Sequence, residues 1–194
     1  MNKHDFSRIH FYEQNFVHIY NKTGSWVAPY WINPTTGEQD VDGYFIYPEN
    51  QKLIIGQFES IFSSFFLVYS NRNFDFCKNI DYFYERQEES GAIRWKYDLK
   101  DNSPVLSPDN PEGVGLPLFA WAEFNLYHKS ANKRRIKDVM PFLQKYMSWL
   151  DATFKQENGL YAAPVTATTI TNCPRGNVKN AVDFNAAMAI NASY

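Results

Sequence analysis

Apolar residues recur at spacings of three and four along most of the chain, the pattern of helices that bury one face. The pattern predicts helices over residues 9–20, 58–69, 76–84, 118–126 and 136–154, and a last one from about residue 180 to the end. Pro141 lies inside the fifth stretch, where proline costs a helix about 3 kcal/mol. We therefore expect a kink or a new helix start at Pro141.

Two long segments rich in proline and glycine separate these helical stretches. They run over residues 23–50 and 90–115, and such clusters are typical of turns and loops. Alternation of apolar and polar residues never extends beyond a few positions, so little or no sheet is expected. The pattern thus predicts an all-α fold in a single domain over residues 1–194, with long functional loops gathered at one end.

Composition restricts the possible partners. The formal net charge is −2, so no overall field favours nucleic acid or an anionic membrane, and neither is expected as a partner. Aromatic residues make up 18% of the chain. That content suits helix packing, and it equally suits sugar binding, in which CH faces stack on rings.

No residue pattern predicts a metal or another cofactor. The two cysteines, Cys77 and Cys173, are far apart, and the four histidines have no metal-ligand spacing. Free thiols suit a reducing compartment. The first residues contain no apolar leader segment, and no stretch reaches the ~18 apolar residues of a membrane span. A soluble cytoplasmic protein is expected.

Four stretches, in order, share motifs with one enzyme family. "GQFESIFSSFF" stands where the family has a Trp-Asp-Ser-x-Phe helix start, and "SGAIRWKYD" where it has a Gly-x-Ile-Pro loop. "GLPLFAWAEFNLY" matches Gln-Pro-Pro-Leu-Leu-Ala-Trp-Ala. "TTITNCPRG" with "AVDFNAAMAINA" matches Ser-Gly-x-Asp-Asn-Ser-Pro-Arg followed by Val-Asp-Leu-Asn-Ala. The chain thus resembles the N-terminal half of (α/α)6-toroid glycoside hydrolases: trehalases, processing α-glucosidase I and mannosylglycerate hydrolases, the family 63-like group.

The resemblance implies about six helices, half of the toroid barrel, and inverting hydrolysis by two carboxyl groups. In the family, the Asp of Ser-Gly-x-Asp is the acid, and a Glu from the second half is the base. The acid position is Thr171 here, and a hydroxyl cannot act as a general acid at neutral pH. Asp109 and Glu112 in "SPDNPEG" are the alternative acids, although this segment is equally typical of ordinary turns.

The same resemblance implies a set of substrate-binding residues. It comprises Glu59, Arg94, Trp95, Asn172, Arg175, Asp183 and Asn185. Glu59 stands where the family has Asp, whereas Arg175, Asp183 and Asn185 are retained. For Asp183 and Asn185 a structural reading stays open, in which Asp183 favours a helix N-terminus and Asn185 ties a loop back.

These residues lead to three hypotheses of function. The first is a glycoside hydrolase-like protein that acts on α-linked glucosyl or mannosyl substrates and shows no turnover without the second half. The second is a catalytically dead carbohydrate-binding relative. The third is a helical protein-interaction domain. Helix faces left without partners in half a toroid also predict self-association.

Overall fold

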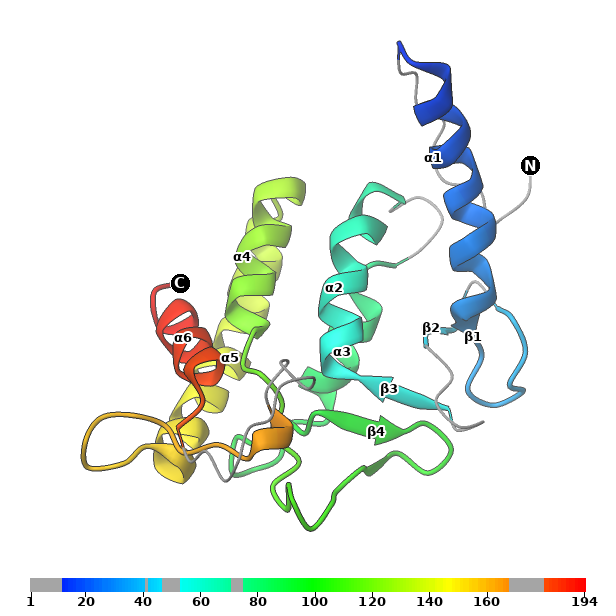
Figure 1. Cartoon of the computed structure of the whole chain (residues 1–194). Coiled ribbons are helices and arrows are strands. Elements are labelled where there is room, and N and C mark those ends of the chain that lie inside the picture. Colours follow the sequence, from blue (N-terminus) through cyan, green and yellow to red (C-terminus); the bar gives the residue numbers. More distant parts are fainter. Residues whose placement is uncertain (1–11, 41, 47–52, 71–74, 168–179) are drawn as a thin grey trace.

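The computed structural model describes residues 12–40, 42–46, 53–70, 75–167 and 180–194 (Figure 1). Six α-helices are present in this part of the chain. They are α1 (Gln14–Val27), α2 (Gln57–Leu67), α3 (Lys78–Glu85), α4 (Phe119–Ser130), α5 (Lys133–Phe154) and α6 (Val182–Ala192). Three short 3-10 helices are η1 (Ala28–Tyr30), η2 (Val68–Ser70) and η3 (Val165–Ala167).

Two small antiparallel sheets overturn the all-α prediction. β1 (Trp31–Ile32) pairs with β2 (Tyr44–Phe45), and β4 (Lys96–Asp98) lies between β3 (Ile54–Gly56) and β5 (Ser103–Pro104). Among the described residues 54% are helical and 11% are in strands or bridges, so the fold is mixed α/β and not an all-α toroid. Each strand has only two or three residues, too few for alternation to show in sequence.

The helices form two layers (Figure 1). α2 and α4 lie side by side, α3 packs behind α2, α5 packs behind α4, and α6 packs against α4. The three-stranded sheet lies below, where β3 leads directly into α2. The layers enclose one large core, and its largest fully buried side chains include Tyr82, Phe83, Phe119, Tyr146 and Phe184. α1 extends away from the other helices (Figure 1).

α2 buries only part of the face that its apolar pattern predicts, since Ile61 is fully buried but two phenylalanines are not. Phe58 and Phe62 are about two-fifths exposed (43% and 40%), whereas Ser60, Ser63 and Ser64 are buried. The hydroxyls of Ser63 and Ser64 donate to helix carbonyls at 3.1 and 2.6 Å, so burial leaves no unpaired donor. Small serine side chains allow the close packing of α3, and this packing leaves the phenylalanines outside.

Pro141 lies within α5 and does not start a new helix. α5 begins eight residues earlier at Lys133, after Asn132, whose side-chain oxygen accepts from Arg135 N at 3.1 Å. An asparagine in this position satisfies one of the free N–H groups of the first turn. Packing of α5 into the core offsets the cost of the proline, since Leu143, Tyr146 and Leu150 are buried after it.

A buried ion cluster joins α3, α4 and α5. Glu123 of α4 is only 2% exposed. Arg135 of α5 donates to both Glu123 carboxylate oxygens at 2.8 and 2.7 Å, and to Asp81 of α3 at 2.8 and 3.2 Å. Tyr84 Oη donates to Glu123 at 3.0 Å. Burial lowers the pKa of Arg135, but its bonds to Glu123 and Asp81 outweigh that effect and raise the pKa overall.

The buried tyrosines predict that stability falls at alkaline pH. Burial raises the pKa of Tyr82 to about 12, against the opposing effect of Arg86. It also raises the pKa of Tyr84 and of Tyr97. In the unfolded chain these hydroxyls titrate near ~10, so the folded state holds more protons above that pH. The contribution of these tyrosines to the free energy of unfolding is complete below about pH 10. It is lost as the pH rises through their folded pKa values.

The measurement is the free energy of urea unfolding at a series of pH values from about 8 to about 12. We expect a steady decline that begins near pH 10, and a shallower decline in Tyr82→Phe. Because Tyr82 Oη donates to Asn102 at 2.8 Å, the variant is compared with its own value at neutral pH. A pH-independent free energy in the wild-type chain would contradict the expectation.

Candidate functional site

Residues from the first three matched stretches line one cavity at the start of α2. This cavity, called the α2 cavity below, has a volume of about 230 Å³. Its walls are Gln57, Phe58, Glu59, Ile61, Trp95, Lys96, Gly115, Leu116, Leu118, Thr166 and Ala167. Thr166 and Ala167 belong to η3, just before the fourth matched stretch. Segments more than 100 residues apart in sequence, from Gln57 to Thr166, thus meet at one place.

Backbone hydrogen bonds hold these segments together. Gln57 N donates to Trp95 O at 2.7 Å, and Trp95 N donates to Gly113 O at 2.6 Å. The pairing of β3 with β4 places Gly56 opposite Lys96. The Gln57 side-chain amide donates to Leu116 O at 2.8 Å. The start of α2 is therefore fixed to both loops that complete the cavity.

Gly115 is required by close contacts in the cavity wall. A Cβ atom on this residue would lie 2.3 Å from Gln57 Oε1 and 3.0 Å from Trp95 Cβ. The first separation is far below van der Waals contact, so no larger residue fits while Gln57 keeps its position. Glycine at this position therefore has a local physical reason.

Gln57 brings an unpaired acceptor to the cavity. The residue is 2% exposed, and its Oε1 accepts no hydrogen bond. The Tyr146 hydroxyl, also buried, is near enough for Gln57 to lower its pKa, although burial raises that pKa overall. The two side chains nevertheless form no hydrogen bond of good geometry. An unpaired buried acceptor costs about 1–3 kcal/mol.

Glu59 supplies the carboxylate of the cavity. It lies in the first turn of α2, whose N-cap is Gly56. A Cβ atom on Gly56 would lie 2.1 Å from Glu59 Oε2, so the carboxylate turns back over the helix N-terminus, where the helix dipole favours a negative charge. Lys96 brings a positive charge to the same wall, and its Nζ lies 5.0 Å from the centre of the Trp95 ring.

The guanidinium of Arg94 forms ion pairs with the carboxylates of both Glu88 and Glu112. Arg94 Nε and Nη2 donate to the two Glu88 carboxylate oxygens at 2.6 and 2.7 Å, and Nη1 lies 3.2 Å from Glu112 Oε2. Burial lowers the pKa of Arg94, yet the bonds to Glu88 and Glu112 raise it overall. Asp109 is exposed, in the turn that joins Ser107 and Asn110. None of Arg94, Asp109 and Glu112 lines the α2 cavity.

Asn185 holds the loop before α6. Its side-chain oxygen accepts from Tyr161 N at 2.9 Å, and its amide donates to Tyr161 O at 3.1 Å and Ala181 O at 3.0 Å. Asp183 lies in the first turn of α6 and accepts from Phe184 N at 3.0 Å. These contacts match the structural reading of both residues. Thr171, Asn172 and Arg175 lie outside the described residues.

Among the predicted site residues that the structure describes, Glu59 and Trp95 lie together in the wall of the α2 cavity. Sequence reasoning missed Gln57, Lys96 and Gly115 as cavity residues. Gln57 directly follows Gly56 at the start of a matched stretch, so its place at a helix start was the available signal. The positions of Lys96 and Gly115 depend on the sheet and on a close contact, and neither leaves a mark in the local sequence.

Two further findings concern metal and membrane. In the part of the chain that the structure describes, no group of three or more His, Cys, Asp or Glu side chains could hold a metal ion. Within the same residues, every helix is too short or too polar to span a bilayer. The cysteine that falls in this part, Cys77, is buried and free.

Comparison with known proteins identifies one similar chain. An "Uncharacterized protein" of Borreliella burgdorferi (strain ATCC 35210 / DSM 4680 / CIP 102532 / B31) is 43% identical over 192 residues, which are 99% of this chain and 40% of that protein. The chain therefore spans about two fifths of the length of the curated relative it matches. No family model and no solved structure matches the chain.

Proposed function

We propose that the α2 cavity binds a carbohydrate unit and belongs to a glycoside hydrolase-like protein that acts on α-linked glucosyl or mannosyl groups. The observation that supports this proposal is the meeting of residues from three matched stretches, and from the edge of the fourth, at one cavity. The resemblance was defined along the sequence alone. A chance set of matches gives no reason for those stretches to share a wall.

The chemistry of the wall suits a sugar. Phe58 and Trp95 provide aromatic faces on which CH groups stack. Glu59 can accept from hydroxyl groups, and Lys96 can donate to one. The volume of about 230 Å³ lies below the ~300–1,000 Å³ of sites for drug-sized ligands. The α2 cavity is thus suited to one sugar unit.

Inverting hydrolysis needs two carboxyl groups about 6.5–9.5 Å apart, one as acid and one as base. Among the described residues, Glu59 is the only carboxylate in the cavity wall. The second group would come from residues outside this description or from the part of the protein that the relative has in addition. We therefore expect binding without measurable turnover in this chain. A cytoplasmic location remains part of the proposal, and the free thiol of Cys77 is compatible with it.

The test is titration of the chain with methyl α-glucoside and methyl α-mannoside, followed by tryptophan fluorescence and calorimetry. One of the two sugars is expected to bind saturably. Glu59→Gln should weaken it about tenfold, the loss of one charge-assisted hydrogen bond of about 1.4 kcal/mol. Trp95→Phe should weaken it as well, through loss of stacking area.

Asp109→Asn is the matched control, because it changes an exposed carboxylate outside the cavity. The Asp109→Asn variant should bind the sugar with the same affinity as the wild-type chain. Two results would count against the proposal: no saturable binding of either sugar, or a loss of binding in Asp109→Asn with none in Glu59→Gln. Circular dichroism of each variant separates lost binding from lost folding.

A further inference from the structure

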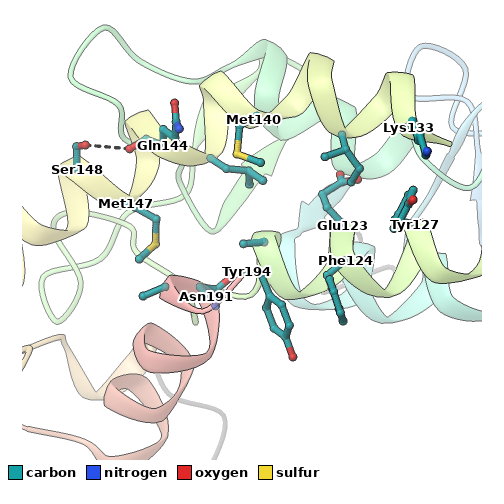
Figure 2. Close-up of a pocket in the computed structure, with 14 residues that line it drawn as sticks. Glu123, Phe124, Tyr127, Lys133, Met140, Gln144, Met147, Ser148, Asn191 and Tyr194 are labelled. Carbon is teal, nitrogen blue, oxygen red and sulfur yellow. Dashed lines mark hydrogen bonds between the residues drawn. The ribbon is translucent and has the colours of Figure 1, made fainter. Parts of the chain in front are cut away.

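An apolar groove lies between α4, α5 and α6, apart from the α2 cavity (Figure 2). Its volume is about 710 Å³. Met140, Leu143 and Met147 of α5 form one wall, and Ala120, Phe124 and Tyr127 of α4 form the other. Figure 2 shows Met140 and Met147 pointing from α5 toward the groove, and Tyr194 beside Phe124. Glu123 also lines the groove, but Arg135 and Tyr84 already pair with it.

Outside the groove lies an aromatic face of α2 and α4, here defined as Phe58, Phe62, Phe65 and Trp121, of which Phe58 and Phe62 are exposed and Phe65 and Trp121 are half-buried. The Phe62 and Phe65 rings lie 5.9 and 5.0 Å from that of Trp121. Phe124, one helical turn after Trp121, stacks on Tyr194 at 4.2 Å. Aromatic side chains thus follow one another from α2 across α4 to the end of α6. Exposed apolar groups gathered in this way are typical of an interaction site.

The shape of the groove suits an α-helix. The wall residues of α5 are spaced by three and four, and those of α4 by four and three, so each helix presents a ridge of the type that interdigitates with a third helix. Methionines adapt their shape to a partner. The layering places α3 behind α2 and α5 behind α4, and α6 packs against α4 at the edge of the groove.

The comparison with the relative gives the source of such a helix. The match takes up 99% of this chain but 40% of the Borreliella protein, so three fifths of a homologous polypeptide are available to pack against this part. A second copy of the chain is the rival occupant, because α1 extends away from the other helices and exposes Phe16 and Ile19, and the experiment below distinguishes the two. Lys133, at one end of the groove, favours an acidic residue on the partner.

We propose that the groove and the aromatic face are covered by an amphipathic helical segment from the part of the relative's polypeptide that has no counterpart in this chain. The interface does not depend on the ligand of the α2 cavity. It explains why α2 exposes Phe58 and Phe62 while it buries its serines: the segment would cover these phenylalanines.

The experiment compares this chain with a chimaera in which it replaces the matched part of the relative. Phe62→Cys reports on the aromatic face and Met140→Cys on the groove. Thr153→Cys, an exposed position on α5 outside the groove lining, is the control. Each protein is treated with iodoacetamide under native conditions, and labelling of the new cysteine is followed by mass spectrometry of its peptide. This readout is independent of sugar binding.

In the chimaera we expect labelling at residues 62 and 140 to slow by about tenfold or more, as for an interface open less than a tenth of the time. Labelling at residue 153 should stay unchanged. Equal rates in the two proteins would overturn the proposal. Protection in the isolated chain that grows with its concentration would also overturn it, since the cover is then a second copy.

A second measurement applies if the chimaera does not fold. The chain and the unmatched part of the relative are produced together as separate polypeptides, with a tag on the chain. The wild-type chain should retain the untagged part in a one-to-one complex, and Met140→Glu should release it. Thr153→Glu should retain it. Retention by Met140→Glu, or no retention by the wild-type chain, overturns the proposal.

Discussion

Arg135→Met will lower the free energy of unfolding by about 3–5 kcal/mol, because it leaves the buried Glu123 carboxylate without its cation. Glu123 is 2% exposed and receives two of the Arg135 hydrogen bonds. After the change, the carboxylate must take up a proton or remain charged in an apolar core. Urea unfolding at neutral pH, followed by circular dichroism, measures the loss.

The double variant Arg135→Met with Glu123→Gln is the matched control. Removal of both charges eliminates the uncompensated carboxylate, and buried ion pairs replaced by neutral groups often cost little. We therefore expect the double variant to be more stable than Arg135→Met alone. If it is less stable, with losses that simply add, the two residues do not act as a pair and the interpretation of the cluster is wrong.

Gly91→Ala will also destabilise the chain by several kcal/mol, for a steric reason. Gly91 has φ of +97°, and a Cβ atom there would lie 2.4 Å from the Lys145 carbonyl oxygen in α5. Two costs combine: a backbone conformation that alanine disfavours by about 1–2 kcal/mol, and a clash with a backbone atom that cannot move without bending α5. Together they are expected to reach about 3–5 kcal/mol.

Gly159→Ala separates the two costs. Gly159 has a similar φ of +80°, and nothing lies within 4 Å of a Cβ placed on it. Only the conformational cost applies there, so we expect a loss of about 1–2 kcal/mol. Thermal and urea unfolding of both variants gives the comparison. Equal losses would mean that contact with α5 does not determine the need for glycine at position 91.

The α2 cavity was only partly predictable from sequence. Trp95 and Glu59 lie in matched stretches and reach the same cavity, but Arg94, next to Trp95, turns toward Glu88. A resemblance places residues along the chain and not the directions of their side chains. Arg94 pairs with Glu88 because the turn at Gly91 brings residue 88 back beside residue 94. No local pattern in the sequence predicts the contact between Arg94 and Glu88.

Helix positions were determined by the sequence itself, because the spacing of apolar residues and the placement of proline and glycine are local properties. The predicted stretches 58–69, 118–126 and 136–154 correspond to α2, α4 and α5. The first predicted helix was offset, since α1 ends at Val27. Its expected inner residues Phe16 and Ile19 are exposed in the structure.

Only the tertiary structure decided the sheets, the buried face of α2 and the α2 cavity. β3 pairs with β4 across about 40 residues of chain, and strands of three residues are stable only when that long-range contact forms. The face of α2 was decided by how closely α3 approaches, which favours small serines over phenylalanines. These outcomes depend on interactions between distant segments, whereas periodicity along a chain reports only how one segment alternates between apolar and polar residues.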